Sequence, residues 1–257
     1  MKKLILLILL IPSLCFGAEP LEIAWMNVPT IAGAGVAAGD SCTGGLLFSW
    51  HMESTTVGSD GDTGCSVNDT TATQVNSASL DTSIYKDGAK SAKIITSGSA
   101  NAYEFSWDSS NPILDTSQGT IDFWFYYTGT LNGQNPLYLI SDANNRIYCF
   151  ISGEYEYLGC AWVYGGSSVS ARTNTDILSA STWYHCKVRW HKGTAHSGLY
   201  EMVSCDTSTG EGNSNDNGTN DLGTWSATSA TLGVGDNGNG SGLTIYVDNL
   251  KIYSTWQ

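Results

Sequence analysis

The sequence predicts an all-β fold, a two-sheet antiparallel sandwich that is disulfide-bonded. Short segments rich in Val, Ile, Tyr, Phe and Trp alternate with clusters of Gly, Asn, Asp, Ser and Thr, with almost no helical periodicity. Only 5 prolines but 29 glycines occur in the 257 residues, so glycine supplies most of the turns. This pattern is typical of β-sandwiches and barrels, and one large sandwich accounts for the length without a second domain.

Residues 1–17 have the features of a signal peptide. Lys2 and Lys3 precede an apolar run over 4–10, and Cys15-Phe16-Gly17 forms a small-x-small cleavage site. The run is too short to cross a bilayer, and no later segment approaches about 20 apolar residues. We therefore expect export to the periplasm, the extracellular space or the cell surface, without a membrane span. Residues 18–45, rich in Ala and Gly, are expected to form an N-terminal arm before a domain at 46–257.

The charge of the chain is strongly negative. Its formal net charge is −13, with 24 acidic and 11 basic residues, and removal of the signal peptide takes away two lysines and no acids. Phosphate binding needs clustered Lys and Arg, so the charge of the chain disfavours nucleic acid as a partner.

Six cysteines remain once Cys15 leaves with the signal peptide, and an even count in an exported protein indicates disulfides. The segment 146–164 is expected to form a hairpin that folds back around Glu154 and Tyr155, which places Cys149 opposite Cys160. In this register one face of both strands is wholly apolar, and a one-residue slip would lose the agreement.

A second hairpin is expected to place Cys186 opposite Cys205, with its turn within 191–198. Cys42 and Cys65 then remain to pair with each other. Free thiols and the fourteen other pairings of six cysteines stay open as alternatives.

In two segments rich in aromatic residues, 119–127 and 182–190, the residues that alternate along the chain differ in polarity. Alternate residues of a strand point to opposite faces, so one face of each strand is expected to build the core between the sheets. The expected core residues are Ile121, Phe123 and Phe125 in 119–127, and Tyr184, Cys186, Val188 and Trp190 in 182–190. The opposite faces carry Asp122, Trp124 and Tyr126, and His185, Lys187 and Arg189.

The order of five segments resembles the laminin-G-like, or concanavalin A-like, jelly-roll domains. The segments are LLFSWHMES (46–54), DGAKSAKI (87–94), GTIDFWFYY (119–127), TWYHCKVRW (182–190) and TLGVGDNGNGSGLTIYVDNLKIY (231–253). A second glycine is absent after DGAKS, and the usual "vnG" ending is missing at LYEMVSC. The resemblance covers about 46–253 and implies a jelly roll in which the strands at 119–127 and 182–190 are neighbours.

That neighbourhood would place Asp122 opposite Lys187 on the outer surface, beside Trp124, Tyr126, His185 and Arg189. Aromatic rings beside hydrogen-bonding groups suit a sugar, which offers an apolar C–H face and hydroxyls. A polysaccharide or surface glycan is therefore the expected partner. The alternative is an outer sheet shielded by loops, with a solvated Asp122–Lys187 pair that contributes about 0–1 kcal/mol.

Asp248 lies in the otherwise apolar terminal strand 242–253, where a carboxylate costs free energy unless a cation or donors satisfy it. The resemblance implies a structural calcium ion there, with Asp248 as side-chain ligand, a backbone carbonyl of Gly88, and Glu53 as a second carboxylate. Calcium takes six to eight oxygen ligands, so carbonyls and waters can complete such a shell. The alternative is an Asp248 carboxylate bonded to backbone N–H groups of a neighbouring loop.

Catalytic motifs are absent from the sequence. No E-x-D-x-x-E strand of a jelly-roll glycosidase occurs, and Glu154 and Glu156 fall at a predicted hairpin tip. The four histidines lack zinc-site spacing, and there is no G-x-S-x-G elbow. We therefore predict a secreted, non-catalytic carbohydrate- or cell-surface-binding protein and not an enzyme. The alternatives are a structural or adhesive surface protein without a glycan site and, third, a polysaccharide-degrading enzyme.

Overall fold

The computed structural model describes most of the chain from residue 45 onward, and all described residues belong to one compact unit, Gly33–Gln257. The described residues are 45–57, 70–75, 78–97, 103–108, 114–115, 117–131, 133–141, 145–192, 199–206, 208–211, 225, 229–234 and 241–257. The expected signal peptide, the N-terminal arm, Cys42 and Cys65 lie outside them.

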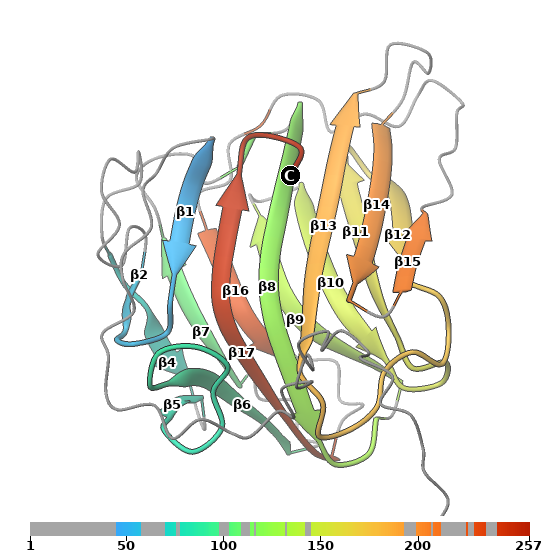
Figure 1. Ribbon diagram of the computed structural model, residues 1–257. Helices are drawn as coiled ribbons and strands as arrows, with labels where there is room; N and C mark the ends of the chain where they lie inside the picture. Colours follow the sequence, from blue (N-terminus) through green and yellow to red (C-terminus); the bar gives the residue numbers. More distant parts are fainter. Residues whose placement is uncertain are drawn as a thin grey trace, which may run out of the picture. The chain divides into compact units, whose positions relative to one another are not determined.

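The described residues form two large antiparallel sheets and one small one, which confirms the predicted all-β fold (Figure 1). The first sheet runs in the order β15 (Ser208–Glu211), β14 (Leu199–Cys205), β13 (Tyr184–Lys192), β8 (Gln118–Thr128), β17 (Ser241–Tyr253), β6 (Ser91–Ser97) and β5 (Ser79–Asp81), and β1 (Leu46–Trp50) also pairs with β17. The second runs β12 (Ser167–Arg172), β11 (Tyr157–Tyr164), β10 (Arg146–Ser152), β9 (Gln134–Ser141), β16 (Ser229–Val234), β7 (Tyr103–Asp108) and β4 (Thr73–Val75). A short ribbon pairs β2 (Thr56–Val57) with β3 (Thr70–Thr71).

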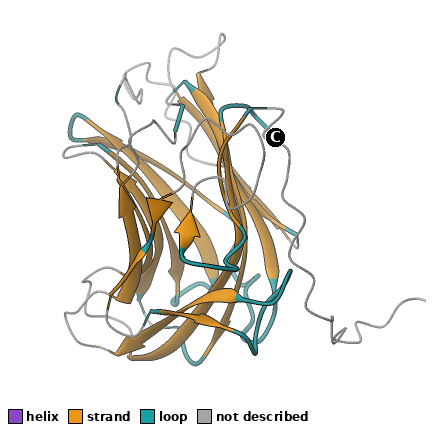
Figure 2. Cartoon of the chain, turned by 90° about the vertical axis from the view of Figure 1, so that its left-hand side faces the viewer, coloured by secondary structure: helices purple, strands orange, loops and turns teal. Residues whose placement is uncertain are grey.

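The two large sheets form the layers of a β-sandwich, seen from the side in Figure 2. Alternate residues of β8 are fully buried, as the apolar pattern predicts: Ile121, Phe123 and Phe125 are all 0% exposed. The second sheet meets them with Ile147, Trp162 and other residues of the same hydrophobic cluster. Each such side chain contributes about 1.5–3 kcal/mol when it leaves water, so this interior is the main source of stability.

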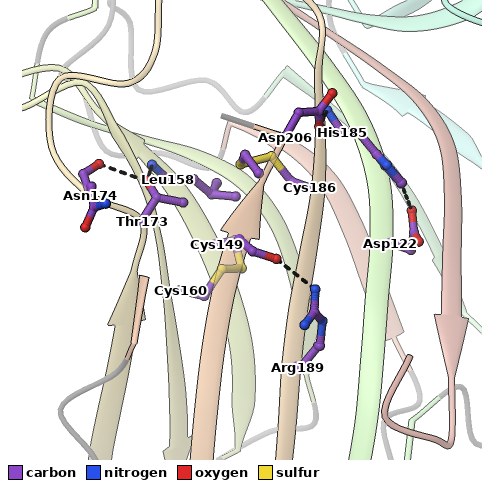
Figure 3. The surroundings of a disulfide bond; sticks show 12 residues. Asp122, Cys149, Leu158, Cys160, Thr173, Asn174, His185, Cys186, Arg189 and Asp206 are labelled. Carbon is purple, nitrogen blue, oxygen red and sulfur yellow. Dashed lines mark hydrogen bonds and ion pairs between the residues drawn. A yellow bond between two sulfur atoms is a disulfide. The ribbon is translucent and has the colours of Figure 1, made fainter. Parts of the chain in front are cut away.

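Both described disulfides confirm the hairpin registers expected from the sequence. Cys149 pairs with Cys160 across β10 and β11, and Cys186 pairs with Cys205 across β13 and β14 (Figure 3). The turn between β10 and β11 spans 153–156, as predicted, and its last residue, Glu156, has a φ of 46°. All four half-cystines are buried, so the bridges lie on the inward faces of their sheets.

The first and last strands of this unit lie side by side. Leu46 pairs with Tyr253, and the Gly45 carbonyl accepts the Ser254 backbone N–H at 2.7 Å. Hydrogen bonds thus join the start of β1 to the end of β17. In the part of the chain that the structure describes, no helix is long and apolar enough to cross a membrane.

Candidate functional site

The outer face of β8 and β13 carries all five residues that the sequence proposes for ligand binding. The two strands pair antiparallel, with Lys187 opposite Asp122 and His185 opposite Trp124, as expected. Arg189 follows one step further along β13, opposite Thr120, and Tyr126 follows Trp124 on β8. The five side chains therefore form one continuous row on the surface of the first sheet.

Asp122 is the polar centre of this row. Its Oδ1 accepts a hydrogen bond from His185 Nε2 at 2.6 Å (Figure 3). Its Oδ2 lies 3.5 Å from Lys187 Nζ. The backbone N–H of His185 donates to Asp206 Oδ1 at 2.6 Å, which holds this point of β13 against the next turn. The three side chains stay partly exposed, so their hydrogen-bonding groups remain within reach of a ligand at the surface.

Trp124 is held between two neighbours. Its ring stacks on the His185 ring with centroids 4.6 Å apart and planes 13° apart, and Lys86 Nζ lies 4.2 Å from the indole centroid. A cation at this distance is attracted to the negative face of the ring by about 0.5–1 kcal/mol at an exposed site. The half-buried indole is therefore fixed in orientation before any ligand arrives.

Tyr126 extends the row into an aromatic cluster. Its ring lies 5.4 Å from that of Trp183 and 5.6 Å from that of Tyr246, and Lys93 Nζ lies 5.7 Å from the Tyr246 centroid. Trp183, Tyr246 and Lys86 were not expected at the site. Tyr246 had a detectable signal, because it is two residues before Asp248 and therefore shares its face of β17.

Arg189 marks the other end of the row. Its Nη2 donates to Ser204 Oγ at 2.9 Å, and its guanidinium carbon lies 5.9 Å from the Trp256 ring. Burial lowers the pKa of Arg189 from its usual value, and the Asp122 charge acts in the opposite direction. A guanidinium stays charged in proteins, so Arg189 supplies a positive charge beside the Asp122 carboxylate.

Asp248 lies on the same outer side of the sheet, beneath the loop 82–90. The pairing of β17 with β8 is irregular between Asp248 and Lys251, and Asn249 there has a φ of 53°, so the strand contains a bulge. Asp248 Oδ2 accepts the backbone N–H groups of Lys86 at 2.7 Å and Asp87 at 3.0 Å. The side chain thus makes the bonds that the sequence left open as the alternative to calcium.

Burial raises the pKa of Asp248 to about 7, and the hydrogen bonds from Asp87 and Lys86 only partly oppose this. Asp248 is 0% exposed, and its Oδ1 has no hydrogen-bond partner of good geometry within the described residues. The buried Oδ1 of Asn249 also has no hydrogen-bond partner within the described residues. Each of these two adjacent residues therefore has a buried side-chain oxygen available to a donor or a cation.

Glu53, which follows β1, contacts the loop 82–90 beside Gly88. Glu53 Oε1 accepts the Ala89 backbone N–H at 2.7 Å, and its carbonyl accepts Lys90 Nζ at 2.7 Å. Gly88 has a φ of 63°, and a Cβ at this position would collide with the Glu53 carboxylate. Of the three residues proposed as calcium ligands, Asp248 and Glu53 thus contact the loop 82–90, and Gly88 belongs to it. Among the described residues, no group of three or more His, Cys, Asp or Glu side chains is suited to a metal.

The geometry therefore defines an all-β sandwich with an aromatic and polar outer face. No protein-family model and no curated protein match the chain. Solved structures do: the "Botulinum Neurotoxin Type G Receptor Binding Domain" matches with a TM-score of 0.60 and 10% identity, over 83% of this chain and 48% of that one.

The binding domain of botulinum neurotoxin DC matches in two complexes. With SialylT the TM-score is 0.61 at 10% identity, and with rat synaptotagmin II it is 0.60 at 12% identity. Each match covers 83% of this chain and 48% or 49% of the other, so the chain spans about half the length of these neighbours. At this identity the similarity shows the fold.

Proposed function

We propose that this protein is an exported, non-catalytic carbohydrate-binding protein whose binding surface is the row Tyr126, Trp124, His185, Asp122 and Arg189. One observation carries the proposal: two adjacent strands bring aromatic rings and hydrogen-bonding groups into one row on the outer face of the first sheet. A sugar ring needs both, because its C–H face packs on an aromatic ring while its hydroxyls exchange hydrogen bonds with charged side chains.

The pre-organisation of the site favours binding. His185 and Lys86 hold the Trp124 ring, and Asp122 holds His185, so little side-chain entropy is lost when a ligand arrives. The sugar contacts the exposed part of the indole, and its hydroxyls bond to Asp122, His185 and Lys187. The fold similarity to receptor-binding domains, one of them in complex with SialylT, supports recognition as the function.

A glycan array tests this function. The wild-type protein is expected to bind a defined set of glycans, and Trp124→Ala to lose that binding. Tyr164→Ala is the matched control, since Tyr164 is an exposed aromatic residue of β11 in the other sheet, and it should bind as the wild type does. A wild-type protein that binds no glycan would support the structural or adhesive alternative. Release of reducing ends from the bound glycans would instead support the third alternative, a polysaccharide-degrading enzyme.

The same proposal includes a jelly roll as the type of β-sandwich and the export of the protein. The five segments that resemble the laminin-G-like and concanavalin A-like jelly rolls include β1, β6, β8, β13 and β17 of the first sheet, and the fifth segment also includes residues 231–234 of β16 in the second sheet. This clustering supports a jelly-roll arrangement. Two buried disulfides support an oxidising compartment, as the signal-like residues 1–17 imply.

A structural calcium ion at Asp248 is part of the proposal. The unpartnered, buried Oδ1 atoms of Asp248 and Asn249 are the hard oxygen ligands that calcium prefers. Gly88 lies on the adjoining loop and Glu53 contacts that loop, so they would complete the site with a carbonyl and a second carboxylate. The ion would balance the Asp248 charge and hold the loop 82–90 on the sheet.

A further inference from the structure

A second row of aromatic side chains lies on the outer face of the other sheet. It consists of Tyr148 and Phe150 on β10, Tyr157 on β11 and Tyr155 in the turn between these strands. Successive ring centroids are 6.2, 6.2 and 6.4 Å apart. Tyr155 is 47% exposed, and the other three rings are partly exposed. We name these four residues the tyrosine strip.

Small residues lie beneath and beside the rings of the tyrosine strip. Phe150 lies opposite Gly159, where a Cβ would come within 2.6 Å of the Phe150 Cζ, so the ring crosses directly over the glycine backbone. Ala161 and Ser170 stand beside Tyr148 on the next two strands, and neither projects far from the sheet. The strip is therefore open toward β12. Packing between cross-strand aromatic residues explains the ring contacts themselves, but it does not explain the charges around them.

Two of the three arginines in the sequence border the tyrosine strip. The Arg146 guanidinium carbon lies 5.4 Å from the Tyr148 ring centroid, and that of Arg172 lies 5.0 Å from the Tyr157 centroid. Both side chains are exposed. Within the described part of the chain, the ion pairs involve lysines and His185 but neither of these arginines. In a chain with 24 acidic and 11 basic residues, these two exposed guanidinium groups have no carboxylate partner among the described residues.

The separation of the two charges indicates the size of the ligand. Arg172 on β12 lies opposite Gly159 on β11, which in turn lies opposite Phe150 on β10. Because Arg146 is four residues from Phe150 along β10, the two arginines are separated by four residues along the strands and by two strands across the sheet. With about 3.3 Å per residue and about 4.8 Å per strand, the two positions are roughly 16 Å apart. A small anion cannot reach both. An extended ligand with repeated negative charges can.

We infer that the tyrosine strip, with Arg146 and Arg172, binds an acidic polysaccharide that carries carboxylate or sulfate groups. The sugar rings lie along Tyr148, Phe150 and Tyr157, and the acidic groups accept paired hydrogen bonds from the guanidinium groups, which match planar oxyanions. Glu154 and Glu156 at the turn limit the surface, since their charges repel the ligand beyond Tyr155. The site lies on a different sheet from Trp124, so it does not depend on the proposed function.

Single-stranded nucleic acid also combines anionic groups with flat rings, but the observations favour the polysaccharide. A nucleic acid carries a charge at every nucleotide and requires a positively charged groove along its backbone. Two arginines roughly 16 Å apart do not provide one, whereas a polysaccharide with acidic groups on only some of its sugars needs no more than these two contacts.

Affinity electrophoresis of the purified protein in gels that contain polygalacturonate, dextran sulfate or uncharged dextran tests the inference. The wild-type protein should be retarded by at least one acidic polymer at low salt and not by dextran. Arg146→Gln/Arg172→Gln should weaken that retardation at least about tenfold, because two charge-assisted contacts are lost. Both arginines are exposed, so an unchanged melting temperature is expected and shows that the variant is folded.

Lys93→Gln/Lys251→Gln is the matched control, because it removes the same charge from β6 and β17 of the first sheet. It should be retarded as the wild type is. The inference is overturned if neither acidic polymer retards the wild type, if dextran does so equally, or if the arginine variant is retarded like the lysine variant. Tighter binding of an oligo-dT strand than of either polymer would overturn it in favour of nucleic acid.

Discussion

The Asp248 carboxylate accepts the backbone N–H of Lys86 at 2.7 Å, although 162 positions separate the two residues in the sequence. Through this bond a buried acid of β17 holds the loop 82–90, and the same loop places the Lys86 ammonium over Trp124. The stability of the strand bulge and the geometry of the candidate binding surface are therefore linked.

Asp248 should make the stability of the protein depend on pH. Its pKa is about 7 in the folded protein and about 3.9 in the unfolded chain, so between these values the native state holds a proton that the unfolded chain has released. The free energy of unfolding therefore falls as pH rises from about 4 to about 7, by at most about 4 kcal/mol from this group. Urea unfolding with EDTA present, across this range, measures the effect.

Asp248→Asn is the control, because the amide oxygen can still accept the loop N–H groups while no charge is buried. The difference in unfolding free energy between wild type and variant should shift in favour of the variant as pH rises. A difference that is constant from pH 4 to 8 would contradict the buried, proton-binding carboxylate.

Calcium should stabilise the wild-type protein. An ion present at a hundred times its dissociation constant adds about 2.7 kcal/mol, and the gain should increase with pH because the ion competes with the Asp248 proton. The melting temperature is expected to fall with EDTA and to recover with calcium but not with magnesium, and Asp248→Ala should not respond. A melting curve indifferent to EDTA, with no calcium found by elemental analysis, would rule out the site.

The two hairpin disulfides should contribute separately to stability. They close loops with sequence separations of 11 and 19 residues, so each is expected to add about 2–4 kcal/mol by restricting the unfolded chain. Non-reducing peptide mapping of exported protein should recover Cys149 with Cys160 and Cys186 with Cys205. A peptide that joins Cys149 to Cys186 would contradict both registers.

Trp124→Ala should affect binding much more than folding. The half-buried indole contacts His185 and Lys86 on the surface, so its loss should cost only about 1–2 kcal/mol, against about 3–5 kcal/mol for a core tryptophan such as Trp190. Thermal unfolding of the two variants gives the comparison. Equal losses would mean that Trp124 is a core residue.

Gly159 should tolerate no side chain while Phe150 is present. Gly159→Ala is expected to cost about 1–3 kcal/mol, because the new Cβ would lie 2.6 Å from the Phe150 Cζ. In the double variant with Phe150→Ala the added cost should largely disappear, and a double-mutant cycle by chemical unfolding measures this coupling. Additive effects would show that Phe150 does not cross the glycine.

Much of the fold could be predicted from the sequence because strand alternation is a local property. The alternating residues of 119–127 and 182–190 identified their buried faces, and the apolar face of 146–164 identified a register that placed Cys149 opposite Cys160. The bulge of β17 between Asp248 and Lys251 became evident only from the pairing with β8.

The surroundings of the candidate site could be predicted only in part. The resemblance to the jelly-roll domains implied that 119–127 and 182–190 are neighbouring strands, which placed Asp122, Trp124 and His185 on one surface, and the pairing of β8 with β13 agrees. It did not indicate that Lys86 covers Trp124, and it left open whether backbone N–H groups or a calcium ion satisfy Asp248, because the loop 82–90 has no periodicity that specifies its place. The tyrosine strip was missed for a similar reason, as Arg172 reaches Tyr157 from a third strand.

The sequence by itself therefore determined the fold class, the two hairpin disulfides and the residues that face outward, because these depend on the period of two along each strand. The tertiary structure alone decided which loop covers the first sheet, which buried oxygens lack a partner and which charges lie over aromatic rings. These contacts join segments far apart in the chain, and their positions depend on how the sheets pack and not on any local pattern.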